Sequence, residues 1–197
     1  MKLLLATGNL HKLSEVKAIL SPFDIELYSL KDFNISMDGV VENGKTYREN
    51  ALIKVNYLKD KVDMPIIADD SGMEIEDMDN QPGIYSARFA AEKGGHKNAI
   101  AYIEEQLKNS KDRKARFVCD IALANVEETP LVFESIVNGT IAKEMHGNEG
   151  FGYDPIFIPD GYTKTYAELS DKEKNTISHR ATALLKMVNY LKEKKMI

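Results

Sequence analysis

The fold is decided at the start of the chain, where residues 2–20 read KLLLATGNLHKLSEVKAIL. Residues 2–6 are apolar enough for a buried strand, and a Thr-Gly-Asn turn breaks the run at 7–9. From 12 to 20 the apolar residues recur at helical spacing. The segment therefore predicts a strand, a loop and a helix, the unit from which α/β proteins are built.

The same alternation of strands and helices continues along the chain. Apolar spacing predicts three further helices, at 46–61, at 98–107 and through Ala181, Leu184, Val188 and Leu191. Short apolar runs predict strands at 25–28, 65–68 and 155–158, and two alternating runs predict a long antiparallel hairpin at 115–125 and 131–137. The Gly- and Pro-containing segment ahead of residue 98 is expected to be a loop. The sequence thus predicts an α/β fold with a mixed sheet flanked by helices.

Composition narrows the classes of protein to which the chain can belong. Its 197 residues, 43% of them apolar, suffice for one core, so we expect a single domain over 1–197. We expect this domain to have two lobes, an N-terminal one and one built on the hairpin, with a central cleft between them as the ligand site. Charged residues make up 29% and the formal net charge is −5, which disfavours disorder and a role in binding nucleic acid.

Neither a secretion signal nor a membrane span is predicted. The apolar run at 2–6 is too short for the core of a signal peptide, and no stretch approaches the ~20 apolar residues that span a bilayer. We therefore expect a cytoplasmic protein with no membrane partner. The single cysteine, Cys119, lies in an apolar run, so a buried structural thiol is favoured over a nucleophile.

The loop at 7–12 has the features of an anion-binding site. It leaves a strand and opens a helix, where backbone N–H groups and the helix dipole favour negative charge. Gly8 lets the backbone approach a ligand closely, and Lys12 adds a full positive charge. The spacing matches neither GxxxxGK[ST] nor GxGxxG, so an ordinary capped turn from strand to helix is an equal alternative.

Acidic residues follow the strand expected at 65–68. Asp69 and Asp70 are adjacent, so their side chains point in opposite directions and one of them can face a ligand. A carboxylate there could bind Mg²⁺ or accept a proton from water, and Glu42, ahead of the second helix, could be a second metal ligand. The alternatives that need no function are a turn rich in Asp and Ser, and a loop acid near a helix start.

The string GFGYDP, residues 150–155, combines glycines with aromatic rings. Flanking glycines leave Phe151 able to stack on a base, and Asp154 could accept hydrogen bonds from that base or orient a neighbouring residue. A tight turn packed on the core is the alternative reading of the same string.

The string EKNTISHR, residues 173–180, gathers hydrogen-bond donors ahead of the last helix. Its candidate helix caps are Asn175, Thr176 and Ser178. An arginine at a helix start opposes the helix dipole, which favours a compensating anion or polar ligand beside Arg180.

Six strings, in order and nearly end to end, resemble the inosine and xanthosine triphosphate pyrophosphatases, which remove deaminated purine nucleotides. They are ATGNLHKLSE, ENGKTYRENALIK, IADDSGMEIE, PGIYSARFA, GFGYDPIF and AELSDKEKNTISHRATAL. The resemblance implies a Mg²⁺-dependent hydrolase that converts a nucleoside triphosphate to its monophosphate and pyrophosphate. It also implies a homodimer with an elongated mixed sheet in a two-lobed fold.

The resemblance implies roles for residues at matching positions as well. The first loop would hold the triphosphate through the side chains of Thr7, Asn9 and Lys12 and the backbone of Gly8, Leu10 and His11. Asp70 would be the catalytic acid and a metal ligand, with Glu42 as the second ligand and Ser71 beside the phosphates. The nucleotide-binding turn would comprise Phe151, Gly152, Tyr153 and Asp154, and the base would be read by Lys174, His179 and Arg180.

Three departures from the family pattern leave these roles in place. They are Asn43 for the usual Thr, Tyr47 for a common Phe, and Ala181 for a frequent Gly, and none removes a charge or a donor from the expected site. Competing hypotheses are a pyrophosphatase for pyrimidine or other modified triphosphates and a nucleotide sensor that binds without hydrolysis. A small nucleic-acid-binding protein is a third, disfavoured by the acidic balance.

Overall fold

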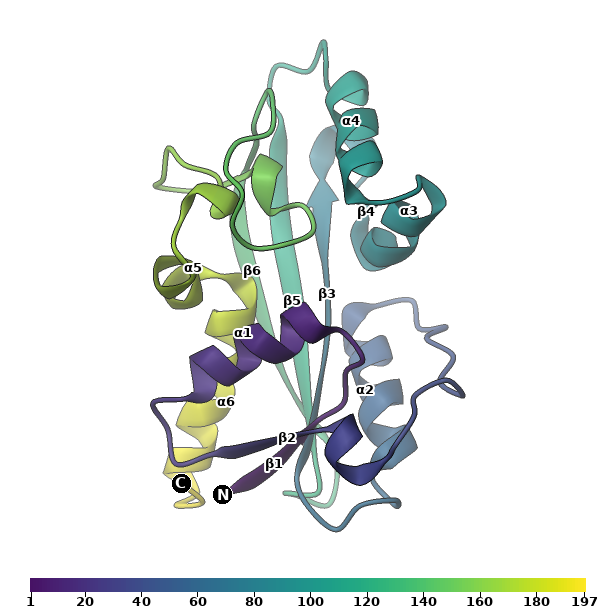
Figure 1. Cartoon of the computed structure of the whole chain (residues 1–197), viewed down its shortest axis with the longest axis vertical. Helices are drawn as coiled ribbons and strands as arrows, with labels where there is room; N and C mark the ends of the chain where they lie inside the picture. Colours follow the sequence, from purple (N-terminus) through teal and green to yellow (C-terminus); the bar gives the residue numbers. More distant parts are fainter. The chain divides into compact units, whose positions relative to one another are not determined.

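The structure, a computed structural model, describes all of residues 1–197 (Figure 1). Its strands are β1 Lys2–Leu5, β2 Glu26–Ser29, β3 Ile66–Ile75, β4 Gln81–Pro82, β5 Lys114–Ala124, β6 Leu131–Ile141 and β7 Phe157–Pro159. Its α-helices are α1 Leu10–Leu20, α2 Tyr47–Leu58, α3 Ser86–Glu92, α4 His96–Gln106, α5 Asp171–Ile177 and α6 His179–Glu193. Short 3-10 helices are η1 Leu30–Phe33, η2 Glu76–Met78, η3 Gly83–Tyr85, η4 Asp154–Ile156 and η5 Tyr166–Glu168. No helix combines the length and apolar character needed to cross a bilayer.

The seven strands form one mixed sheet, as the sequence predicts. Its order is β2-β1-β3-β5-β6-β7, with β4 beside β3. β1 pairs in parallel with both β2 and β3, whereas β4 pairs antiparallel with β3 and β7 antiparallel with β6. The parallel pairs come from the early strand–helix alternation, and β5 and β6 are neighbours joined by residues 125–130, as expected of a hairpin. The α/β prediction is confirmed.

The chain forms two compact units. The first comprises Met1–Asp70, Cys119–Ser135 and Arg180–Ile197, and the second comprises Ser71–Val118 and Ile136–His179. In the first unit, alternate residues of the strands enter two different cores, because successive side chains of a strand point to opposite faces. Leu3, Leu5 and Ile67 pack with residues of α1 and α6, while Leu4, Ile66 and Ala68 pack with residues of α2. The helices of the first unit thus cover both faces of its strands (Figure 1).

The second unit has a core of its own, rich in aromatic rings. It joins Met73 and Ile75 of β3 to apolar residues of α3 and α4 and to Phe157 and Tyr166. The Phe117 and Phe157 rings meet edge to face with centroids 4.8 Å apart. The first unit therefore has two apolar clusters and the second unit has one of its own.

The predicted end of the third strand is wrong. The sequence analysis stops this strand at residue 68, before the acidic pair, whereas β3 runs on through Asp69 and Asp70 to Ile75. Seven of the nine residues that follow Ile66 are buried, so the polar stretch is held inside the protein and not in an exposed turn. The two carboxylates can be buried within the strand because cations from the helices pair with them.

Two helices are missing from the sequence analysis. The segment expected to be a loop ahead of residue 98 contains α3, and the donor-rich string ahead of the last helix contains α5. Ser170 caps α5 by accepting a hydrogen bond from the Glu173 N–H, so the cap candidates Asn175 and Thr176 are wrong because both lie inside this helix. Ser178 caps the C-terminal end of α5. Helices of seven residues carry too few apolar repeats to be recognised by spacing.

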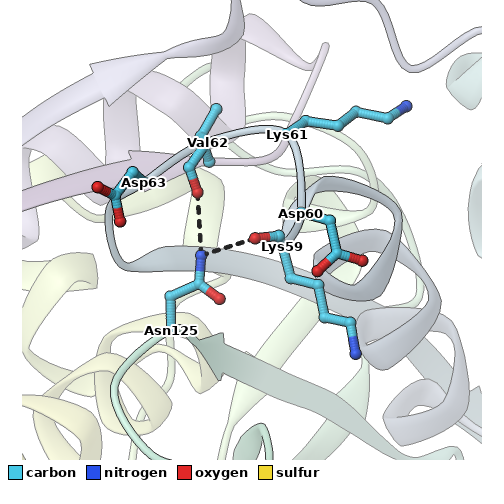
Figure 2. A pocket seen from close by; sticks show the side chains of 6 residues that line it. All are labelled: Lys59, Asp60, Lys61, Val62, Asp63 and Asn125. Carbon is cyan, nitrogen blue, oxygen red and sulfur yellow. Dashed lines mark hydrogen bonds between the residues drawn. The ribbon is translucent and has the colours of Figure 1, made fainter.

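A polar hollow of roughly 420 Å³ lies beside the loop between α2 and β3. It is lined by Lys59, Asp60, Lys61, Val62, Asp63 and Asn125. Figure 2 shows the Asn125 side chain reaching this loop from the end of β5. Its amide nitrogen donates to the carbonyl oxygens of Lys59, Val62 and Met64 at 3.1–3.2 Å. These hydrogen bonds therefore connect the β5–β6 hairpin to the loop before β3.

Candidate functional site

The loop between β1 and α1 is organised by its own side chains. The Asn9 Oδ1 accepts hydrogen bonds from the N–H groups of His11 and Lys12, at 2.9 and 3.2 Å, and so caps α1. The Thr7 Oγ1 accepts a hydrogen bond from the Asn9 N–H at 3.1 Å. The helix consequently begins at Leu10, two residues earlier than predicted, and its positive end points into the loop.

The side chain of Lys12 lies against the first acidic residue of the pair. Its Nζ is 2.9 Å from the Asp69 Oδ2, and the same oxygen accepts hydrogen bonds from Nη2 and Nε of Arg180 at 2.9 and 3.2 Å. Burial opposes ionisation of Asp69, but the charges of Lys12, Arg180 and Lys54 outweigh it and hold the pKa of this carboxyl far below its ordinary value. Asp69 is therefore a fixed anion that joins α1 and α6 to β3.

Asp70 points to the opposite face of β3, toward α2. Its Oδ2 accepts a hydrogen bond from Nδ2 of Asn50 at 3.2 Å, and its Oδ1 lies 3.3 Å from Nζ of Lys54. Burial raises the pKa of Asp70, with Lys54 and Lys12 opposing the change and Asp69 and Glu42 adding to it. The prediction that two adjacent carboxylates face opposite sides is confirmed, and their pKa values are displaced in opposite directions.

Glu42 and Asp70 share a cation. The Glu42 Oε2 is 3.0 Å from Nζ of Lys54, which also donates to the Asp69 carbonyl oxygen at 2.7 Å. Burial lowers the pKa of Lys54, but the carboxylates of Asp70, Asp69 and Glu42 outweigh burial and raise it. Two carboxylates from separate segments thus converge on one positive charge, and carboxylate oxygens are the ligands that Mg²⁺ prefers.

Lys54 and Asn50 are absent from the residues that the sequence analysis selects. Both lie on the buried face of α2, one helical turn apart, beside Ala51, Val55 and Leu58. A lysine and an asparagine within an otherwise apolar face are the signal that could have identified them, because a buried polar group needs a partner. The expected partner is a polar group on the strand that the helix covers.

In the second unit, the turn at 150–154 is held by Asp154. Its Oδ2 accepts a hydrogen bond from the Phe151 N–H at 2.8 Å and lies 2.6 Å from Nζ of Lys174. Gly150 has φ +70°, and a Cβ there would come within 2.1 Å of the same oxygen, so the turn requires glycine at this position. Nζ of Lys174 also lies 5.1 Å from the centroid of the Phe151 ring.

His179 is buried among aromatic rings of the second unit. Its ring stacks on Phe117 with centroids 4.4 Å apart and an interplanar angle of 6°, and the Tyr166 ring lies beyond at 6.4 Å. Tyr153 is buried too, and its hydroxyl donates to the Ser86 carbonyl oxygen at 2.8 Å. The structure thus brings Lys174 together with Phe151 and Asp154, and places His179 in the core of the same unit.

The predicted need for an anion beside Arg180 is met by the protein itself. Arg180 is 2% exposed and pairs with Asp69 and with Glu15 of α1. Cys119 is fully buried and burial raises the pKa of its thiol, which confirms the structural reading of this residue. Leu10 is exposed at the start of α1, and Ser71 follows Asp70 on β3.

The fold and these side chains define an α/β protein whose mixed sheet carries a buried network of lysine, arginine and carboxylate groups, with an aromatic and acidic turn in its second unit. The chain belongs to the Ham1 family, whose model matches residues 3–190. This finding confirms the resemblance noted in the sequence.

Individual relatives agree with this assignment. The chain is 44% identical to a dITP/XTP pyrophosphatase of Clostridium perfringens over 97% of both chains. It is 43% identical to a dITP/XTP pyrophosphatase of Thermoanaerobacter pseudethanolicus, over 97% of this chain and 96% of that protein. The solved structure of the Staphylococcus aureus Ham1 protein superposes with a TM-score of 0.87 at 35% identity and covers 98% of this chain and 100% of that one.

Proposed function

We propose that this chain is a pyrophosphatase that hydrolyses deaminated purine nucleoside triphosphates, namely ITP, dITP and XTP, to the monophosphate and pyrophosphate. The observation that carries the proposal is the acidic pair on β3, where Asp69 is held as an anion and Asp70 shares Lys54 with Glu42. Relatives at 43–44% identity that are named for this activity support the choice of substrate.

The charges of the first unit support a need for a divalent cation. The ion-pair network of this unit contains three cations and four carboxylates, so its net charge is −1 when all are ionised. The cations are Lys12, Lys54 and Arg180, and the carboxylates are Glu15, Glu42, Asp69 and Asp70. A triphosphate adds several more negative charges, so binding it requires added positive charge. Asp70 and Glu42 fit Mg²⁺ because both are oxygen ligands that already converge on one ammonium group.

Each residue then has a defined task. The capped start of α1 and Lys12 would bind phosphate oxygens, since a helix N-terminus and an ammonium group both favour anions. Mg²⁺ on Asp70 and Glu42 would neutralise the phosphates and lower the pKa of a water molecule. Asp70 is the candidate proton acceptor, because the resemblance places the catalytic carboxylate at this position and a buried carboxylate there could accept a proton from water.

The choice of base is proposed from the resemblance in the sequence. A 6-keto purine presents an acceptor at position 6 and a donor at N1, the reverse of adenine. In the structure Lys174 binds Asp154 and Arg180 binds Asp69 and Glu15, so reading a base would require these side chains to exchange their protein partners for the base. The donors of Lys174, His179 and Arg180 would then face a donor of adenine, a mismatch of about 1–3 kcal/mol. Phe151 would stack on the base, with Gly152, Tyr153 and Asp154 shaping its turn. A homodimer and a cytoplasmic location belong to the proposal on the same basis.

Pyrophosphate release from ITP, XTP, dGTP, UTP and ATP, with and without Mg²⁺, tests the proposal. We expect Mg²⁺-dependent release that is fastest with ITP or XTP. Fastest turnover of UTP would indicate a pyrimidine pyrophosphatase, and saturable ITP binding without any pyrophosphate would indicate a nucleotide sensor. Either result would contradict the proposal.

Asp70→Asn is expected to lower turnover of ITP by at least ~10²-fold, the low end of what a general base contributes. Asp38→Asn, at an exposed aspartate, serves as the matched control and should keep the wild-type rate. Near-normal pyrophosphate release by Asp70→Asn would refute the assignment of Asp70, whatever the substrate.

A further inference from the structure

Asn50 contacts both Asp70 and the loop that carries Glu42, the two residues that the proposed function assigns to the metal. Its side chain is on the buried face of α2, and the residue is 1% exposed. The amide Nδ2 donates to the Asp70 Oδ2 at 3.2 Å, and the amide Oδ1 accepts a hydrogen bond from the Gly44 N–H at 2.9 Å. One carboxamide therefore connects the carboxylate on β3 to the loop that carries Glu42.

The contact to Asp70 fixes the orientation of its carboxylate. Asn50 holds Oδ2 while Lys54, one helical turn further along α2, contacts Oδ1 at 3.3 Å. Rotation of the carboxylate about its Cβ–Cγ bond would break both contacts. α2 thus presents a matched pair of donors to the two oxygens of a single residue.

The contact to Gly44 fixes the loop two residues after Glu42. A Cβ at position 44 would lie 2.7 Å from the Asn50 Oδ1 and 2.7 Å from Cβ of Glu49, so the backbone passes α2 as closely as glycine allows. The φ of Gly44 is not in the left-handed region, so close approach and not backbone conformation is what requires glycine here. The Lys45 N–H also donates to the Glu49 carboxylate at 2.5 Å, next to the same contact.

We propose that Asn50 is a positioning residue that sets the separation and orientation of Asp70 and Glu42 for a divalent cation. The inference rests on the proposed function, because it takes these two residues as the metal ligands. Partners that orient metal ligands typically change metal affinity by about 10–100-fold when they are removed. A role limited to packing would instead change stability and leave metal affinity as it is.

The test measures metal binding apart from turnover. Mn²⁺ is titrated into substrate-free protein and free Mn²⁺ is followed by electron paramagnetic resonance, and the Mg²⁺ concentration for half-maximal ITP hydrolysis is measured separately. Asn50→Leu removes both hydrogen bonds at similar volume, and Gly44→Ala opens the loop contact while keeping Asn50. Asn56→Leu, at an exposed position of the same helix, is the control.

We expect Asn50→Leu and Gly44→Ala each to weaken Mn²⁺ binding and to raise the half-saturating Mg²⁺ concentration by about 10-fold or more. The KM for ITP at saturating Mg²⁺ should be unchanged, and Asn56→Leu should match the wild type. If Asn50→Leu fails to fold, Gly44→Ala decides the outcome alone.

Wild-type Mn²⁺ affinity in a folded Gly44→Ala protein would overturn the inference, as would wild-type affinity in folded Asn50→Leu. Failure of the proposed function gives a different result, in which the unmodified protein itself neither binds Mn²⁺ nor needs Mg²⁺ for hydrolysis. The two failures are therefore distinguishable in one set of titrations.

Discussion

Asp120 on β5 is 4% exposed, and its Oδ1 has no hydrogen-bond partner. Burial, with a smaller contribution from the negative charge of Glu134, raises the pKa of Asp120 to about 6. An aspartate in an unfolded chain titrates near pH ~3.9, so the folded protein binds this proton more tightly than the unfolded chain does. The contribution of Asp120 to the free energy of unfolding must therefore decrease as the pH rises from about 4 to about 6 and stay lowered above that range.

Asp120→Asn should remove this pH-dependent decrease in the free energy of unfolding. We expect the difference in unfolding free energy, variant minus wild type, to increase between about pH 4 and pH 6 and then to level off. Urea unfolding at about pH 4, 5, 6 and 7 measures this difference across the titration. The exposed control Asp38→Asn should show no such trend, and a flat difference for Asp120→Asn would mean that folding does not raise the pKa of Asp120.

Arg180 gives the opposite case, a buried charge with two partners. Replacing it by methionine would leave Asp69 and Glu15 without the cation that they share, and such a loss typically costs about 3–5 kcal/mol. The matched control is Lys108→Met, which removes an exposed ion pair with Glu105, worth about 0–1 kcal/mol. Denaturant unfolding of both variants checks the contrast, and equal losses would contradict it.

The same Arg180 variant tests the proposed reading of the base. If the guanidinium contacts the 6-keto group, Arg180→Met should lower the ratio of kcat/KM for ITP over ATP. Loss of stability at an unchanged ratio would restrict Arg180 to holding α1 and α6 on Asp69. Nothing in the string EKNTISHR distinguishes these roles, because the partners of Arg180 lie more than a hundred residues away in the chain.

Apolar spacing along the sequence predicted the elements whose buried face is apolar throughout. The helix with Ala181, Leu184, Val188 and Leu191 on one face is α6, and all four residues enter one core. β3 was cut short because Asp69 and Asp70 resemble a turn, and their suitability for a strand depends on Lys12 and Lys54 from two helices. Local sequence cannot contain that information, since the compensating charges are tertiary contacts.

For the predicted site too, features visible in the local sequence were selected and features that depend on tertiary contacts were not. Strings along the chain selected the α1 loop, Asp70, Glu42 and the turn around Phe151 as candidates, because glycines and charges at strand ends are visible locally. Lys54 and Asn50 were missed because a helix that buries polar groups differs from an ordinary helix only in what it packs against.

Asn125 sets the contact between the β5–β6 hairpin and the loop before β3. It has φ 61°, where asparagine is tolerated and alanine costs about 1–2 kcal/mol, and its side chain donates to three carbonyl oxygens. Asn125→Gly keeps the backbone conformation and loses the hydrogen bonds, whereas Asn125→Ala loses both. We therefore expect thermal unfolding to rank wild type above Asn125→Gly above Asn125→Ala, with the exposed Asn109→Ala near wild type. A reversed order of the two Asn125 variants would show that flexibility outweighs backbone strain at this turn.

For the whole molecule, the two compact units are interleaved in the sequence. The first is assembled from three segments and the second from two, and β3, β5 and β6 each begin in one unit and end in the other. Neither unit is therefore one continuous stretch of the chain. The two units therefore cannot be separated at one linker, and the single domain over 1–197 stays a prediction.

Unfolding should accordingly be one cooperative transition. If β3 detaches, Ile66 and Ile67 leave the cores of the first unit. Met73 and Ile75, on the same strand, then leave the core of the second unit. Hydrogen exchange read by mass spectrometry, over a range of urea concentrations, follows peptides from α1 in the first unit and from α4 in the second. We expect the most protected amides of both helices to share one free energy of opening and one dependence on urea. Two separate values would mean that each core is stable alone, and the chain would then be two domains that exchange strands.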